Sequence, residues 1–201
     1  LLERGVIVCA PQLLLWNTGE ALETAPSYSV SYNREETDNK LKHYGSSITA
    51  LEIYNIKRSI DYLETLDCVK ADKIGMMGLS YGGFFTLYTM AADTRIVSGY
   101  SCGCFNDRTK FDTVDWTWKN SGNTYHDAEV AGLCAPRRLY LEVGKSDEVF
   151  DYQYAVKEAA RVTKYFNAFH AQEKIRFHVC YGGHKVNSDN EGLHFFLEDF
   201  F

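Results

Sequence analysis

The sequence predicts a three-layer α/β sandwich with a mostly parallel sheet. Short apolar runs alternate with longer segments of helical periodicity, and this alternation indicates parallel strands covered by helices on both faces. Glycine-rich and polar residues directly follow several of the runs, at the places where functional residues gather in such sheets. The 201 residues, 45% of them hydrophobic, are expected to form a single domain over residues 1–201.

The expected elements follow one another without an internal repeat. Gly5 and Pro11 bound the first apolar run, and Ser46 or Ser47 can cap the first long helix. A loop as long as the one expected at 12–44 usually covers or forms a site. In order, the elements are a helical turn at 1–4, a strand at 6–10, a loop at 12–44, a helix from 46 or 47 to about 67, a strand from 74, a turn at 78–83, a helix through 90, a strand at 96–102, a polar loop at 103–123, a strand at 139–143, a helix at about 152–169, a strand at 175–181 and a helix at 191–201.

The turn GLSYGG at residues 78–83 has the features of a nucleophile site. A tight strand-to-helix turn strains its central residue, Ser80, and leaves room only for small residues on either side. The Ser80 hydroxyl is then exposed at the carboxyl end of the sheet, next to the positive end of the helix dipole. The backbone N–H of Tyr81, directly after Ser80, is the predicted donor to an oxyanion. The alternative is a glycine-serine turn that only connects two elements.

Two further residues complete the requirements of a reactive serine, because its hydroxyl needs a base and the base needs a carboxylate to orient it. Asp147 follows the strand at 139–143, and His184 follows the strand at 175–181. The order Ser, Asp, His along the chain is typical of a nucleophile elbow. We therefore predict Ser80 as nucleophile, Asp147 as acid and His184 as base. Weaker candidates for the acid or the base are Glu148, Asp151, Asp107, Asp127, His178 and His194.

Composition argues against several classes of partner. The net charge of −6 and the lack of a Lys/Arg block argue against nucleic acids and anionic membrane surfaces. No window approaches the roughly 20 apolar residues that a membrane span needs. A small molecule or a neutral polymer fits better. The six cysteines lie mostly in apolar segments, so we expect reduced, buried thiols and a cytoplasmic protein.

Aromatic residues in the two long polar loops are candidates to line a substrate pocket. Trp16 lies in the first loop, and Trp116 and Trp118 lie in the second. The alternative is that these rings only pack their loops onto the body of the protein.

Four segments together resemble the α/β-hydrolase superfamily, and within it the dienelactone-hydrolase-like and acetyl-xylan-esterase-like group. They are RGVIVCAP, KIGMMGLSYGGF, CAPRRLYLEVGKSDEVF and YGGH. The resemblance implies the α/β-hydrolase fold, with Ser80, Asp147 and His184 as the triad and Tyr81 as an oxyanion donor. It implies hydrolysis of a carboxylic ester, usually of a small acyl group on a sugar or similar alcohol, without a metal or organic cofactor.

The resemblance also has departures and rivals. If RGVIVCAP is the fourth strand of the family, its first three strands and the second oxyanion donor lie upstream of Leu1. We therefore expect this chain to be the carboxyl portion of a longer protein. A targeting signal upstream of Leu1 is an alternative to the cytoplasmic location. Gly-x-Ser-Tyr-Gly-Gly also resembles the catalytic domain of prolyl-oligopeptidase-like peptidases. A second rival is a hydrolase fold without activity that serves as a binding module.

Overall fold

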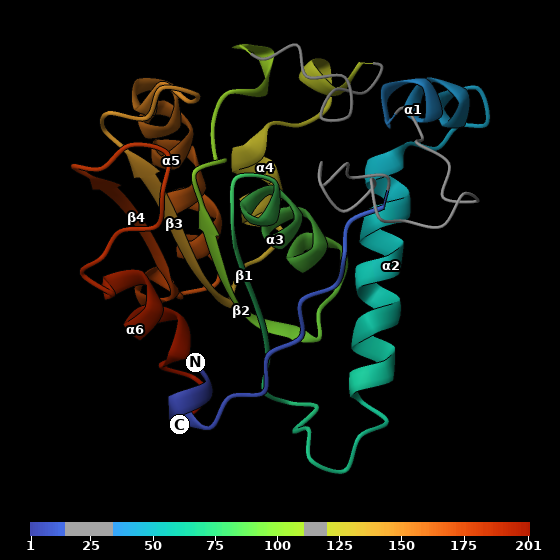
Figure 1. The fold of residues 1–201 in the computed structure, drawn as a ribbon. Coiled ribbons are helices and arrows are strands. Elements are labelled where there is room, and N and C mark those ends of the chain that lie inside the picture. Colours follow the sequence, from blue (N-terminus) through green and yellow to red (C-terminus); the bar gives the residue numbers. More distant parts are fainter. Residues whose placement is uncertain (15–33, 111–119) are drawn as a thin grey trace. The chain divides into compact units, whose positions relative to one another are not determined.

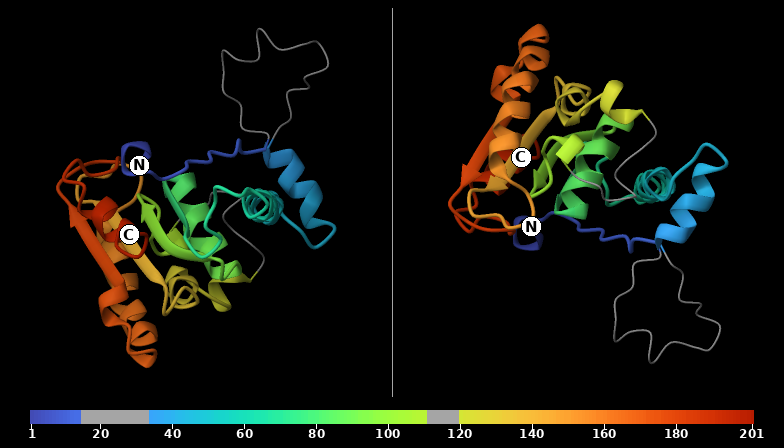
Figure 2. Two further views of the ribbon diagram at one scale, coloured as in Figure 1. Left: turned by 90° about the horizontal axis from the view of Figure 1, so that it is seen from below. Right: turned by 90° about the horizontal axis from the view of Figure 1, so that it is seen from above.

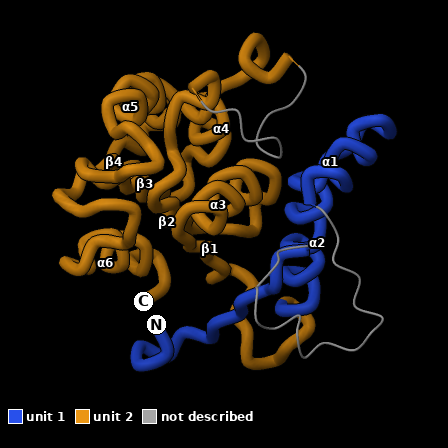
Figure 3. The backbone as a smooth tube through the Cα atoms, turned by 45° about the horizontal axis from the view of Figure 1, so that its top comes forward, with its two compact units in different colours: residues 1–63, 112–118 blue, residues 64–111, 119–201 orange. Residues whose placement is uncertain are grey.

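The computed structural model describes residues 1–14, 34–110 and 120–201. The chain divides into two compact units (Figure 3). The first comprises residues 1–63 and 112–118, and the second comprises residues 64–111 and 119–201. All three predicted triad residues belong to the second unit.

The second unit is built on a four-stranded parallel sheet, as the sequence predicts (Figure 1). Its strands are β1 (Ile74–Leu79), β2 (Ile96–Cys102), β3 (Arg138–Gly144) and β4 (Ile175–Cys180), and they lie side by side in this order. Figure 2 shows the same order by colour, from green β1 to red-orange β4. Near the carboxyl ends, one row of paired residues crosses the sheet and consists of Leu79, Cys102, Glu142 and His178. Residues that follow the strands are thereby brought to one edge.

Helices cover both faces of this sheet. They are α3 (Tyr81–Ala92), α4 (Asp127–Gly132), α5 (Tyr152–Ala168) and α6 (Glu191–Leu197). A Cβ atom on Gly99 of β2 would lie 2.6 Å from the Met90 sulfur of α3, whereas the adjacent Ser98 hydroxyl donates to the Phe196 carbonyl of α6 at 2.8 Å. Because adjacent residues of a strand point to opposite faces, α3 and α6 lie on opposite sides. The predicted three layers are confirmed.

The first unit contains a 3-10 turn at Leu2–Arg4, then α1 (Arg34–Lys42) and α2 (Ile48–Leu63). The Ser47 hydroxyl accepts from the Ala50 N–H at 3.0 Å, so the predicted cap is present. The buried Asp38 of α1 accepts from the Ile48 N–H at 2.8 Å and caps the same helix end. Two side chains therefore satisfy the first N–H groups of α2.

Three expectations about secondary structure are wrong. The run at 6–10 is not a strand: Ile7 is 53% exposed and Val8 is 50% exposed, and the run pairs with no described strand. Apolar composition predicts a strand only where a neighbouring strand accepts its hydrogen bonds. Within the expected loop at 12–44, α1 is a helix without an apolar face, with i, i+4 pairs such as Glu36 to Lys40. The last helix ends at Leu197 rather than at 201.

Two further expectations concern the burial of the cysteines and the absence of a membrane-spanning segment. All six cysteines are free; Cys102, Cys104, Cys134 and Cys180 are buried as expected, but Cys9 and Cys68 are exposed. Both exposed thiols lie outside the helices and strands. None of the helices in the described parts of the chain has the length and hydrophobicity to cross a membrane.

Candidate active site

Ser80 sits in a strained turn between β1 and α3. Its backbone has φ 57° and ψ −117°, which is uncommon for a residue with a side chain and costs of order 1–3 kcal/mol. The Ser80 N–H donates to the Cys102 carbonyl at 2.9 Å, and the Ser80 carbonyl accepts from the Phe84 N–H at 2.9 Å. These bonds tie the turn to the end of β2 and to the first turn of α3. Tyr81 is the first residue of α3, next to the serine.

Small residues around Ser80 are required by close backbone contacts. A Cβ atom on Gly78 would lie 2.4 Å from the Gly82 carbonyl carbon, and one on Gly83 would lie 2.5 Å from the Cys102 carbonyl oxygen. Both distances are too short for any other side chain unless the backbone moves. The GLSYGG sequence thus produces the tight turn that it predicts.

His184 and Asp147 are hydrogen-bonded to each other. The His184 Nδ1 lies 2.9 Å from the Asp147 Oδ2, and the two side chains are 18% and 1% exposed. The other oxygen of Asp147 accepts from the N–H groups of Val149 and Phe150 at 2.8 and 3.0 Å, which holds the carboxylate in place. The Phe150 ring packs against the imidazole, with centroids 5.7 Å apart.

Backbone hydrogen bonds join the loops that carry this pair. Lys145 N–H donates to the Cys180 carbonyl at 2.8 Å, and Ser146 N–H donates to the Gly182 carbonyl at 3.0 Å. The turn after β3 and the turn after β4 are therefore one connected structure. This explains why residues far apart in sequence, on turns after adjacent strands, meet here.

Gly103 lies between the serine turn and the histidine. It follows Cys102, which accepts from Ser80, and a Cβ atom on it would lie 3.3 Å from the His184 Cε1 and 3.1 Å from the Leu79 Cδ1. Its φ of +59° also favours glycine. No hydrogen bond joins the Ser80 hydroxyl to His184 among the interactions of the described residues. Catalytic hydrogen bonds are often long or poorly aligned before substrate binds.

The competing acids have other partners. Asp151 caps α5 by accepting from the Gln153 N–H at 2.9 Å, and Asp127 forms an ion pair with the buried Arg108 at 2.7 Å. Asp107 accepts from the backbone and hydroxyl of Thr109.

The remaining candidates lie elsewhere or outside the described residues. Glu148 is exposed beside Asp147 but forms no hydrogen bond with His184 in the described structure. His178 lies within β4 and His194 within α6, the strand and the helix in which the sequence predicts them. Trp16, Trp116 and Trp118 lie outside the residues that the structure describes.

Glu142 is a buried residue that sequence reasoning missed. It is 0% exposed, and its Oε1 accepts from the Asn187 N–H at 2.9 Å and from the Tyr100 hydroxyl at 3.1 Å. The Cys102 thiol donates to the same oxygen at 3.3 Å and also contacts the Lys185 carbonyl. Glu142 therefore anchors the loop that follows His184. The signal in the sequence is a single charge inside the apolar strand LYLEV.

Comparison with known proteins gives structural matches only. No protein-family model matches the sequence, and the search of curated proteins gives no match. Among solved structures, a glucuronoyl esterase from Solibacter usitatus matches with a TM-score of 0.59 at 19% identity, over 90% of this chain and 51% of its own.

Two other matching structures are also described as esterases. A promiscuous CE15 esterase from a marine bacterial metagenome matches with a TM-score of 0.65 at 16% identity, over 93% of this chain and 54% of its own. A Bacteroides fragilis protein described provisionally as an acetyl xylan esterase matches with a TM-score of 0.58 at 14% identity, over 76% of this chain and 42% of its own. The chain thus spans about half the length of these neighbours. It has the α/β-hydrolase fold that these esterases share.

Proposed function

We propose that this protein is a serine hydrolase that cleaves carboxylic esters, with Ser80 as nucleophile, His184 as general base and Asp147 as the acid that orients the base. The observation that carries the proposal is the 2.9 Å hydrogen bond between His184 and Asp147 at the same edge of the sheet as the strained Ser80 turn. The esterases among the structural neighbours support an ester rather than a peptide as the substrate.

The proposed reaction begins with proton transfer from Ser80. With Nδ1–H of His184 donating to Asp147, the Nε2 lone pair accepts the serine proton while Oγ attacks the acyl carbon. The carbonyl oxygen becomes an oxyanion, and the Tyr81 N–H at the positive end of α3 stabilises it. The C–O bond to the alcohol then breaks, and the imidazolium returns its proton to the leaving oxygen. This leaves an acyl group on Ser80.

Water completes the cycle by the same groups. The His184 Nε2 takes a proton from water, and the resulting hydroxide attacks the acyl carbon. The bond to Ser80 breaks, the imidazolium gives the proton back to the serine oxygen, and a carboxylic acid leaves. Asp147 stays ionised throughout and stabilises the imidazolium in both halves of the cycle.

The proposed substrate class is an ester of a carbohydrate. The support comes from the neighbours, whose names describe glucuronoyl, methyl and acetyl xylan ester hydrolysis. The glucuronoyl and acetyl xylan names describe esters with a sugar on one side of the scissile bond. We propose a small acyl or alkyl group on the other.

Labelling with a fluorophosphonate tests the nucleophile. We expect an adduct on Ser80 that disappears in Ser80→Ala but persists in Ser146→Ala, which replaces an exposed serine on a neighbouring turn. Wild-type protein that forms no adduct would contradict the triad and favour the inactive binding module.

Parallel assays with acetylated and methyl-esterified sugars and with a proline-containing peptide amide test the substrate class. We expect turnover of the esters. Turnover of the amide alone would replace the esterase proposal with the peptidase alternative.

A further inference from the structure

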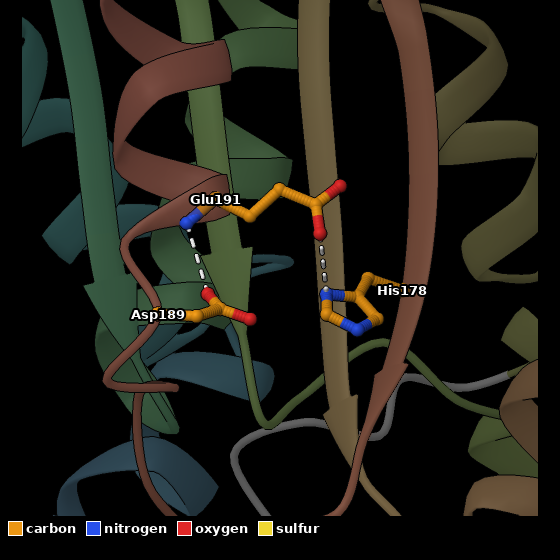
Figure 4. A group of neighbouring side chains, drawn as sticks. All are labelled: His178, Asp189 and Glu191. Carbon is orange, nitrogen blue, oxygen red and sulfur yellow. Dashed lines mark hydrogen bonds and ion pairs between the residues drawn. The ribbon is translucent and has the colours of Figure 1, made fainter.

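Three side chains outside the proposed triad converge on the α6 face of the sheet (Figure 4). His178 comes from β4, Asp189 precedes α6 and Glu191 is the first residue of that helix. One nitrogen or oxygen of each lies within 4.8 Å of those of the other two, and the His178 Nδ1 lies 3.7 Å from the Glu191 Oε2. Imidazole and carboxylate are the groups that bind transition-metal cations in proteins.

A buried carboxylate from the neighbouring strand is aimed at this group. Glu142 pairs with His178 in the β3–β4 register, so both side chains lie on the same face. The Glu142 Oε2 is buried, accepts no hydrogen bond from the described residues and lies 4.0 Å from the His178 Nδ1. A buried carboxylate oxygen without a partner is costly, and a nearby cation would offset that cost.

The Tyr140 hydroxyl is hydrogen-bonded to the same imidazole nitrogen that faces the carboxylates. The hydroxyl oxygen lies 2.7 Å from the His178 Nδ1. Nδ1 is also the ring nitrogen that lies next to Glu191 and Glu142, so a cation bound at Nδ1 takes the place of this hydrogen bond.

The local charges also favour a divalent ion. Glu191 is paired with Arg176, with 2.9 Å between the Arg176 Nη1 and the Glu191 Oε1, and the Arg176 side chain is about half exposed. The positive charge of Arg176 therefore offsets the negative charge of Glu191, one of the three converging carboxylates. The charges of Asp189 and Glu142 suit a cation of charge +2.

We propose that His178, Asp189 and Glu191 bind a divalent transition-metal cation of the zinc class, with the buried Glu142 carboxylate stabilising its charge. The imidazole favours such an ion over calcium or magnesium, which prefer oxygen ligands alone. Because Asp189 lies in the loop after β4 and His178 lies within β4, the bound ion ties that loop to the sheet.

Zinc titration of the whole chain tests the site. After treatment with a chelator, the protein is titrated with Zn²⁺ in competition with a chromogenic chelator, and thermal unfolding is followed with and without the ion. We expect one tightly bound equivalent that raises the melting temperature. Asp189→Asn and Glu191→Gln are expected to weaken zinc binding by more than about tenfold. Mutation of residues that only hydrogen-bond to metal ligands already lowers metal affinity by about this factor.

A matched control separates this site from adventitious binding. Glu173→Gln removes an exposed carboxylate just before β4 and is expected to leave zinc affinity unchanged. The exposed thiols Cys9 and Cys68 are the competing ligands. Zinc binding that is equal in wild type, Asp189→Asn and Glu191→Gln would place the ion elsewhere and overturn the proposal, as would an absence of binding. Both substitutions are at exposed positions, and the unfolding curves without zinc report whether each variant folds.

Discussion

Replacing Asp147 by asparagine tests the pair on which the proposed chemistry depends. The Asp147 Oδ2 accepts from the His184 Nδ1 at 2.9 Å, and its side chain is 1% exposed. In the transition state the imidazolium is stabilised by the carboxylate charge. For charges about 4 Å apart at an effective dielectric constant of about 20, this interaction is worth about 4 kcal/mol. Asp147→Asn should therefore lower kcat by about a thousandfold, at about 1.4 kcal/mol for each factor of ten.

The assay measures kcat and KM for an activated acetate ester, alongside the rate of fluorophosphonate labelling. Stability should change little, because the asparagine carbonyl can still accept from the Val149 and Phe150 N–H groups. Glu148→Gln is the matched control, since it removes the adjacent exposed carboxylate, and it should keep wild-type kcat. The reasoning fails if Asp147→Asn keeps wild-type kcat in a folded protein, or if Glu148→Gln causes the larger loss.

Three other predictions concern stability and reactivity. Hydrogen bonding to Arg138 lowers the pKa of Asp199 to about 2, so its stabilisation is present at neutral pH and is lost as the pH falls from about 4 to about 2. Asp199→Asn should lower the urea midpoint at pH 7, and its deficit should shrink in acid; an equal deficit at both pH values would contradict this. Gly78→Ala should lower the melting temperature through its 2.4 Å backbone contact, whereas Gly82→Ala, which meets nothing within 4 Å, should not; similar effects would argue against the tight turn. Iodoacetamide should modify the two exposed thiols of the native protein and spare the four buried ones, three of which have pKa values raised by burial; rapid loss of all six would be inconsistent with the fold.

Much of the second unit follows from local sequence patterns. The strand at 96–102 has the expected bounds, and β3 and α5 match to within one residue at each end. Short buried strands and amphipathic helices have periods that a single sequence displays. The helix α1 shows no such period, because charged pairs and the buried Asp38 stabilise it instead of an apolar face.

Local sequence patterns also predict only part of the candidate active site. The strained conformation of Ser80 follows from glycines only two residues away on either side, so the sequence predicts it locally. The sequence favours Asp147 as the acid but does not exclude Glu148 and Asp151. That distinction depends on which of these side chains, all after β3, contacts His184 after β4. The roles of these residues in catalysis stay predictions.

By itself, the sequence determined the alternation of strands and helices, the tight turn at Ser80 and the order of the candidate triad, since each depends on neighbours a few positions away. Only the tertiary structure decided which carboxylate meets His184, that the apolar run at 6–10 pairs with no described strand, and that Glu142 lies beside His178. The physical reason is that hydrogen bonds between strands and charges buried between layers join residues distant along the chain. A local sequence pattern does not specify such partners.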